Sequence, residues 1–138
     1  MSNRVIKFRG EQVNDEWCYG SLFLFEDGSA NIFVGTDEEG FGRYYSINPE
    51  TVGQFTGLLD KDGKEIFEDD IVLFADSEIY KIVYSDQKAC FSLDGVGRFA
   101  DIMTVIAEAR QNQLTSLYNE RFQVIGNIHE HLHLMEPK

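Results

Sequence analysis

Acidic side chains gather in one stretch, where eleven residues hold six carboxylates: Asp60, Asp62, Glu65, Glu68, Asp69 and Asp70. Such a cluster could bind calcium, because an EF-hand loop places oxygen ligands at fixed intervals. The register does not fit, since a loop with Asp60 at its third position would begin at Leu58, which has no side-chain oxygen. Its twelfth position would be Asp69 rather than a bidentate Glu. The spacing therefore argues against a calcium loop.

The same acids could act as a catalytic pair, which requires two carboxylates in a cleft with pKa values pushed apart. No His or Cys lies near them in the sequence to cooperate. Asp62-Gly63 between two apolar runs is instead typical of a hairpin turn. We interpret the stretch as a turn that leads through an acidic, solvent-facing edge into an apolar strand.

Three histidines near the C-terminus alternate in "HEHLH": His129, His131 and His133. On an extended strand they would share one face and could hold zinc with an open fourth position. Side chains two residues apart on a straight strand are separated by about 7 Å, which works against convergence on one ion. We favour a mobile polar C-terminal segment and expect no metal site.

Two glycines in "GVGRFA", residues 95 to 100, match the phosphate-binding loop G-x-G-x-x-A of dinucleotide-binding folds. The chain ends ten residues after the next expected strand, which closes at Ile128. That length leaves no room for the remaining parallel strands of such a fold. We interpret the glycines as a loop before a helix and predict no nucleotide cofactor.

The net charge of −12 excludes most nucleic-acid binders, which neutralise phosphates with Lys and Arg. A small basic group, Arg4, Lys7 and Arg9, is interpreted as a solvated strand edge. Aromatic residues near position 20 could stack on bases, but no Lys or Arg is interleaved with them. We assign this group to the core or to a protein interface: Trp17, Cys18, Tyr19, Phe23 and Phe25.

Turn signals recur at short intervals and predict a mainly β, β-rich α+β fold. Strands are expected at residues 4–10, 17–25, 30–35, 43–47, 65–75, 78–85, 88–93 and 121–128. Asp27-Gly28 predicts a hairpin turn, Asn48 and Pro49 the start of one helical turn, and Gly126 a bulge. Apolar residues at helical spacing predict one amphipathic helix near residues 99–112.

The cellular location follows from three features of the sequence. Two cysteines, Cys18 and Cys90, do not form a disulfide framework and fit a reducing compartment. The N-terminal residues lack the apolar segment of a secretion signal, and no run approaches the ~18 apolar residues of a membrane span. We expect a soluble cytoplasmic protein.

Three blocks of the sequence resemble, in order and spacing, the YopX family of phage and prophage proteins. They are "IKFRG" at 6–10, "TVGQFTGLLDKDGKEIFEDDIVLF" at 51–74 and "FQVIGNIHE" at 122–130. The resemblance implies a single domain over residues 1–138, with an N-terminal β-hairpin region and a small SH3-like β-barrel in the C-terminal part. It allows a subdivision into residues 1–50 and 51–138, and it implies assembly into homo-oligomers.

Two residues depart from the family pattern. Asp69 stands where the family usually has Gly, and His129 stands where it usually has Tyr. Asp tolerates a left-handed backbone better than most residues do. A positive φ at Asp69 would therefore indicate that the usual Gly has a backbone role.

The resemblance implies no activity, and the sequence offers no coherent nucleophile, base or cofactor set. We expect a non-enzymatic phage or prophage accessory protein that acts through protein contacts, including self-association through strand edges and aromatics. The alternative is an acidic inhibitor that mimics DNA phosphates and occupies a nucleic-acid-binding protein of the host. A small ligand-binding protein or enzyme is the third hypothesis. We expect no catalytic, cofactor-binding or metal-binding residues.

Overall fold

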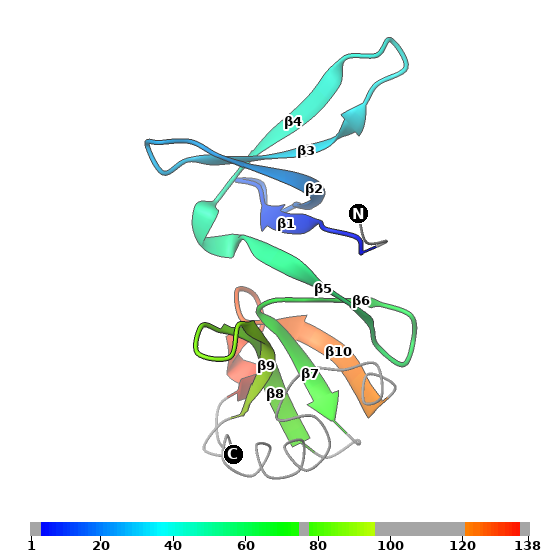
Figure 1. Cartoon of the computed structure of the whole chain (residues 1–138), viewed down its shortest axis with the longest axis vertical. Coiled ribbons are helices and arrows are strands. Elements are labelled where there is room, and N and C mark those ends of the chain that lie inside the picture. The colour runs from blue at the N-terminus through cyan, green and yellow to red at the C-terminus, as the bar shows by residue number, and fades with distance from the viewer. Residues whose placement is uncertain (1–3, 75–77, 96–120, 136–138) are drawn as a thin grey trace. The chain divides into compact units, whose positions relative to one another are not determined.

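The computed structural model describes residues 4–74, 78–95 and 121–135 as strands joined by short turns (Figure 1). The strands are β1 (Phe8–Glu11), β2 (Trp17–Leu24), β3 (Ala30–Thr36), β4 (Gly42–Ile47), β5 (Gly53–Leu59), β6 (Glu65–Phe67), β7 (Asp70–Phe74), β8 (Glu78–Ser85), β9 (Cys90–Gly95) and β10 (Phe122–Asn127). Two short 3-10 helices complete them, η1 (Pro49–Thr51) and η3 (Leu132–Met135). The mainly β prediction is confirmed. The helix expected near residues 99–112 lies outside the described residues.

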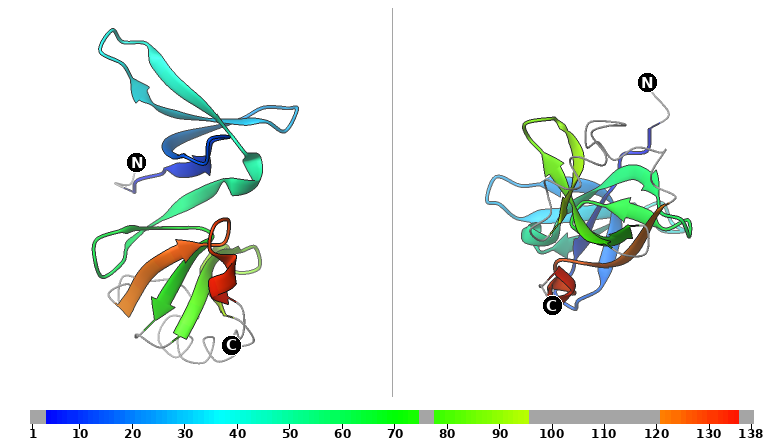
Figure 2. Two further views of the ribbon diagram at one scale, coloured as in Figure 1. Left: turned by 180° about the vertical axis from the view of Figure 1, so that it is seen from behind. Right: turned by 90° about the horizontal axis from the view of Figure 1, so that it is seen from below.

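The chain divides into two compact units, unit 1 from Met1 to Phe55 and unit 2 from Thr56 to Lys138. Neighbouring strands of unit 1 pair in the order β4-β3-β2-β1-β5 (Figures 1 and 2). Strand β5 continues past Phe55 and has β6 as its neighbour in unit 2. A separate antiparallel sheet of unit 2 has the order β10-β7-β8-β9.

Besides the Gln12–Glu16 turn, which has Asp15 at its fourth position, three hairpins share the same five-residue turn with a glycine there, at Phe25–Ser29, Asp37–Phe41 and Asp60–Lys64. In each turn the first N–H donates to the fifth C=O, and the fourth N–H donates to the first C=O. The glycines of the three hairpin turns have φ of 90°, 90° and 84° in chain order. Glycine adopts this left-handed backbone without steric cost. The turns expected at Asp27-Gly28 and Asp62-Gly63 are confirmed.

Unit 1 has a small core on one face of its sheet. The buried residues are Cys18, Ala30, Ile32 and Ile47. They lie on β2, β3 and β4 at positions that the strand pleat turns to the same side, because side chains alternate along a strand. The intervening side chains therefore face the opposite side of the sheet.

Unit 2 has a larger core that includes aromatic rings. Its buried members are Ile66, Val72, Phe74, Tyr80, Ile82, Leu93 and Phe122. The rings of Phe74 and Phe122 pack with their centroids 5.0 Å apart. Phe122 and Phe74 are also register partners in the antiparallel pair of β10 and β7, so ring packing and backbone hydrogen bonds hold the same two strands together.

The SH3-like barrel expected in the C-terminal part is not found. A barrel closes when the first and last strands of a sheet pair with one another. Among the strands that the structure describes, β10 and β9 are the two edges of the four-stranded sheet, which stays open. The barrel prediction is therefore corrected to an open antiparallel sheet.

The single strand expected over residues 65–75 is also wrong, because a turn divides it into β6 and β7. Asp69 has φ of 73°, a left-handed conformation that a continuous strand does not contain. Its N–H donates to the Ile82 carbonyl at 2.8 Å, and its carbonyl accepts from the Ile128 N–H at 3.0 Å. The backbone at this position is thus left-handed and bonded on both sides, a place where glycine fits without strain.

The second departure from the family pattern lies beside the first. Nε2 of His129 is 3.4 Å from Oδ2 of Asp69, and both side chains are mostly buried. The Asp side chain at a left-handed position therefore has a partner from the segment that follows β10. The two departures form one interaction.

Two further sequence predictions are confirmed. Asn48 caps η1 by accepting a hydrogen bond from the Glu50 N–H, and Pro49 opens the turn. The register of β10 against β7 shifts between Val124 and Gly126, which places the bulge where glycine was expected to mark one.

Within the described ranges, no helix is both long enough and apolar enough to span a membrane.

Candidate protein-interaction surface

Asp60, the first acid of the central cluster, holds two segments of unit 2 together. It is only 6% exposed. Oδ1 accepts hydrogen bonds from the N–H groups of Asp62 and Lys64, at 2.9 and 2.8 Å. Oδ2 accepts from the Val124 N–H of β10 at 2.9 Å. The carboxylate thus fixes its own turn and joins that turn to a strand 64 residues away.

Asp70 is the second buried acid of the cluster. Its Oδ2 accepts a hydrogen bond from the Phe67 N–H at 2.7 Å, which closes the turn between β6 and β7. The expectation of an acidic, solvent-facing edge is therefore wrong for Asp60 and Asp70. Their carboxylates are used as backbone acceptors, so the geometry gives these two acids a structural role.

The three histidines do not alternate along a strand, because β10 ends at Asn127 before the first of them. The chain turns there, and the Asn127 side chain accepts from the N–H groups of His129 and Glu130. His131 and His133 have ring centroids 6.3 Å apart, while His129 lies beside Asp69. In the described part of the chain, no group of three or more His, Cys, Asp or Glu side chains could hold a metal ion.

The N-terminal basic residues are not a solvated strand edge. Strand β1 lies between β2 and β5, and Arg9 is 6% exposed. Its guanidinium carbon is 4.9 Å from the centroid of the Trp17 ring, and Nζ of Lys7 is 5.3 Å from that of Phe55. Both cations lie over aromatic faces, which attract positive charge. Arg4 is exposed.

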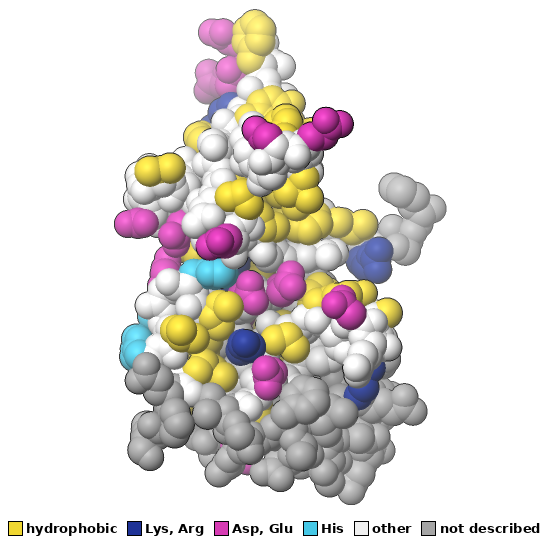
Figure 3. Space-filling model, turned by 90° about the vertical axis from the view of Figure 1, so that its left-hand side faces the viewer, with side chains coloured by type: hydrophobic (Ala, Val, Ile, Leu, Met, Phe, Trp, Pro, Cys, Tyr) yellow, Lys and Arg dark blue, Asp and Glu magenta, His cyan; other side chains and the backbone are white. Residues whose placement is uncertain are grey.

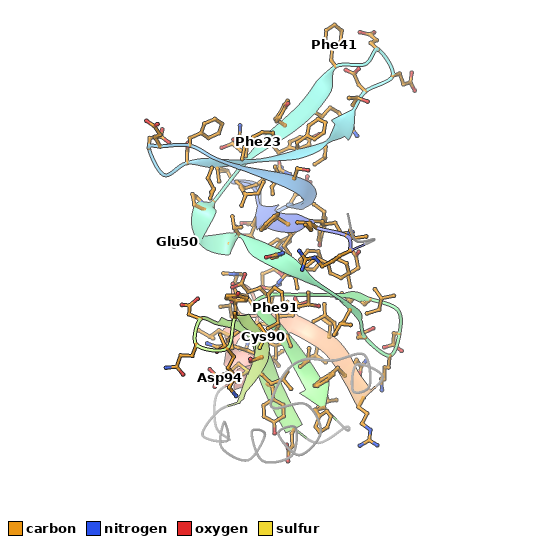
Figure 4. All side chains as sticks on the ribbon, viewed as in Figure 1. Phe23, Phe41, Glu50, Cys90, Phe91 and Asp94 are labelled. Atoms are coloured by element: carbon orange, nitrogen blue, oxygen red, sulfur yellow. The ribbon has the colours of Figure 1, made fainter. Side chains whose placement is uncertain are left out.

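The first glycine of the expected phosphate loop, Gly95, is the last residue of β9, and residues 96–100 lie outside the described residues. A shallow hollow of about 170 Å³ lies here, lined by Lys81, Asp94, Gly95, Leu132 and Met135. Asp94, shown in Figure 4, is 3.9 Å from the Lys81 ammonium. The hollow is smaller than the ~300 Å³ at which small-molecule sites begin. The hollow is therefore too small to serve as a small-molecule site.

The most prominent surface feature of unit 1 is the sheet face opposite its core. We call it the aromatic face and define it by Tyr19, Phe23, Phe33 and Tyr44. The Tyr44 ring lies 5.6 Å from Phe23 and 5.1 Å from Phe33, centroid to centroid. Phe23 and Tyr44 are 45% and 54% exposed. Figure 4 shows Phe23 on its strand and Phe41, also exposed, at the tip of the β3–β4 hairpin.

Acidic residues flank the aromatic face. The segment from residue 19 to residue 50 contains six acids and a single basic residue, Arg43. The acids are Glu26, Asp27, Asp37, Glu38, Glu39 and Glu50, all exposed. The hydroxyl of Ser29 donates to Asp27 at 2.6 Å, and its N–H donates at 2.9 Å; these bonds lower the pKa of that carboxyl. Hydrophobic and acidic side chains of unit 1 lie side by side in Figure 3.

The structure sorts the residues that the sequence assigned to core or interface. Cys18 belongs to the core: its thiol donates to the Gly10 carbonyl at 3.6 Å, and burial raises the pKa of the thiol. Tyr19, Phe23 and Phe25 are exposed. The sequence reasoning missed Phe33 and Tyr44: Phe33 follows the buried Ile32, and Tyr44 lies three positions before the buried Ile47, so strand alternation places both on the face opposite the core.

Similarity to known proteins extends over nearly the whole chain. A family model described as YopX protein matches residues 7–136. Among solved structures, protein EF1440 from Enterococcus faecalis is similar, with 24% identity and a TM-score of 0.53. The similarity covers 97% of this chain and 100% of that chain, and at this identity it shows a shared fold alone. No curated protein is similar enough to count as a match.

Proposed function

This chain belongs to the YopX protein family, and from that premise we propose that it is a non-enzymatic phage or prophage accessory protein. It acts in the cytoplasm of the host bacterium by binding a protein, either a host partner or further copies of itself. The aromatic face of unit 1 makes the contact. The exposure of Phe23 and Tyr44 on a regular sheet is the observation that carries this proposal.

Large aromatic side chains are enriched in protein interfaces, where they supply much apolar contact area with few rotatable bonds. In unit 1 they occupy paired strands, so the backbone beneath them is held by the hydrogen bonds of the sheet. Tyr44 contacts two neighbouring rings, which limits its motion before binding. A surface ordered in advance loses less entropy when a partner docks.

The non-enzymatic part of the proposal has support from the groups that could have reacted. Asp60 and Asp70 are occupied as acceptors for backbone N–H groups. The Cys18 thiol is buried, and its raised pKa keeps it protonated at neutral pH. The two free cysteines also fit the reducing cytoplasm that the proposal places the protein in.

Mimicry of DNA phosphates is the second candidate function. It has support from the exposed acids of unit 1, which outnumber the basic residues there. Those acids lie at hairpin turns and after β4, whereas the aromatic face supplies contact area that a phosphate mimic does not need. We therefore rank protein binding through the aromatic face first.

The proposal is tested with the double variant Phe23→Ser/Tyr44→Ser. The matched control is Tyr84→Ser in unit 2, which removes another aromatic side chain that is 45% exposed. Sedimentation velocity over a wide concentration range measures self-association, and quantitative pull-down from host cells measures retention of a partner. Circular dichroism verifies that each variant folds.

We expect the wild type and the control to form the same complex. The double variant should bind at least about tenfold more weakly, since hot-spot truncations cost about 2 kcal/mol or more. A wild type that is monomeric and retains no protein would refute the proposal, as would a double variant that binds normally. Displacement of the bound partner by duplex DNA would favour mimicry instead.

A further inference from the structure

Strand β4 forms an edge of the unit 1 sheet. It pairs with β3, and no other strand among those described lies on its outer side (Figure 1). Every residue from Gly42 to Ser46 is exposed, and Ile47 alone is buried. The outer edge of a strand carries alternate N–H and C=O groups without a strand partner, which makes it a template for another extended chain.

Natural sheets protect such edges with prolines and charged side chains. Strand β4 contains no proline, and Arg43 is its one charged residue. Tyr44 on the same strand belongs to the aromatic face, with its ring against Phe23 and Phe33. An added strand would therefore gain backbone hydrogen bonds and would place alternate side chains next to these rings.

Negative charge lies at both ends of β4. Before the strand, the turn contains Asp37, Glu38 and Glu39. After it, Glu50 follows on η1, labelled in Figure 4. Ile47 pairs with Ala30, so the β2–β3 turn with its own acids also lies toward this end.

We propose that β4 accepts an extended, Lys- or Arg-bearing segment of a partner protein as an added strand. Apolar side chains of that segment cover the aromatic face beside Tyr44, and its basic ends lie against the two acidic ends of β4. This inference rests on the proposed function, and it specifies the chemistry of the partner. Strand addition uses main-chain hydrogen bonds for affinity and alternate side chains for specificity.

The charges disfavour a second copy of this chain as the added strand. An antiparallel pair of β4 strands would bring the acidic start of each strand toward the acidic end of the other. Two chains that each carry a net charge of −12 also repel one another as they approach. A basic segment removes both costs, because its charges complement the surface.

The test measures fluorescence anisotropy of a labelled peptide, Lys-Arg-Thr-Val-Thr-Val-Thr-Lys-Arg, against the full-length protein. One control peptide is N-methylated at every central residue, so that its central residues cannot donate main-chain hydrogen bonds. Another replaces each Lys and Arg with Glu. The protein variant Glu38→Lys/Glu50→Lys reverses one charge at each end of β4. Asp62→Lys/Asp86→Lys makes the same change in charge at exposed positions of unit 2.

We expect the basic peptide to bind the wild type and the unit 2 control, with at least about tenfold weaker binding to Glu38→Lys/Glu50→Lys. Both control peptides should bind at least about tenfold more weakly, and binding should fall near an ionic strength of about 1 M, where the Debye length is about 3 Å. Equal binding of the N-methylated peptide, or of the Glu38→Lys/Glu50→Lys variant, would overturn the inference.

A further outcome separates this inference from the proposed function. A wild type that ignores the basic peptide, yet forms a complex that Phe23→Ser/Tyr44→Ser loses, would overturn the basic-strand inference and leave the proposed function standing. If that complex were a dimer of this chain, a second copy would be the occupant of the surface. Loss of both activities would refute both statements together.

Discussion

The two units differ in where several of their aromatic side chains lie. In unit 2, Phe74, Tyr80 and Phe122 lie in the core with at most 8% exposure. In unit 1, Cys18, Ala30, Ile32 and Ile47 form the buried cluster, and Phe23 and Tyr44 are exposed. Strand pleating separates the two faces in both units, but it does not say which face is covered. Aromatic content alone therefore does not distinguish a buried core from an exposed sheet face.

Two turns of the same local geometry show the difference again. Asp37 and Asp60 each open a turn, and each accepts from the backbone N–H groups two and four residues later. Asp37 is exposed, whereas Asp60 is buried and also accepts from Val124. One motif thus serves as a local turn in unit 1 and as a long-range connection in unit 2.

The largest predicted effect is on the free energy of unfolding, when one aromatic side chain is removed from each unit. Phe122→Ala leaves a cavity beside Phe74 and should lower the free energy of unfolding of unit 2 by about 3–5 kcal/mol. Phe23→Ala removes a half-exposed ring and its contact with Tyr44, and it should cost about 0.5–1.5 kcal/mol, the range of an aromatic pair. Urea unfolding followed by circular dichroism measures both. Similar losses in the two variants would mean that Phe23 is part of a core.

The next largest effect is the loss of stability when the turn carboxylate of Asp60 or of Asp37 is removed. Asp60→Ala leaves the partly buried N–H of Val124 without its acceptor and should cost about 1–3 kcal/mol, since donors left unsatisfied away from water are destabilising. Asp37→Ala leaves the N–H groups of Glu39 and Phe41 to bond with water instead, and it should cost about 0.5 kcal/mol. Hydrogen exchange at the Val124 amide gives a local readout, which should rise in Asp60→Ala alone. Equal losses would contradict a long-range role for Asp60.

A smaller effect concerns the contact between Asp69 and His129. A double-mutant cycle with Asp69→Gly and His129→Ala should give a coupling energy of about 0.5–1 kcal/mol, because residues in direct contact do not act additively. Asp15→Gly is the control, because Asp15 also has a positive φ, 65°, but lies in unit 1. Combined with His129→Ala, it should show additive effects. A cycle for Asp69 that is equally additive would show that the contact does not stabilise the protein.

The smallest effect is the pH dependence of Asp27→Asn. Hydrogen bonds from Ser29 lower the folded-state pKa of Asp27 below its ordinary value of 3.8, so the ionised carboxylate adds stability that is complete above that value. This contribution is lost as the pH falls through the folded pKa. The melting temperature of the wild type should slightly exceed that of Asp27→Asn at pH 7, and the two should converge below pH 3.8. A difference that persists at lower pH would assign the effect to something other than the charge.

Local features of this fold follow from the sequence because neighbouring residues determine them. Gly28 and Gly63 mark turns that need a left-handed backbone, and Asn48 caps the turn that Pro49 begins. The turn at Asp69 was missed because a strand was expected to continue through it, although the family's usual Gly pointed to a special backbone there. The surface aromatics were assigned only as core or interface, since alternation gives two faces without naming the buried one.

The sequence by itself determined the β-rich class, the hairpin turns, most strand positions and the family. The tertiary structure alone decided that Asp60 binds the Val124 amide, that Arg9 lies over Trp17, and that the sheet of unit 2 stays open. Turns and strand pleats arise from backbone sterics within a few residues, whereas these contacts join segments whose meeting depends on the packing of a whole unit. The aromatic face belongs to the second class, because the core of unit 1 decides which side of the sheet stays exposed.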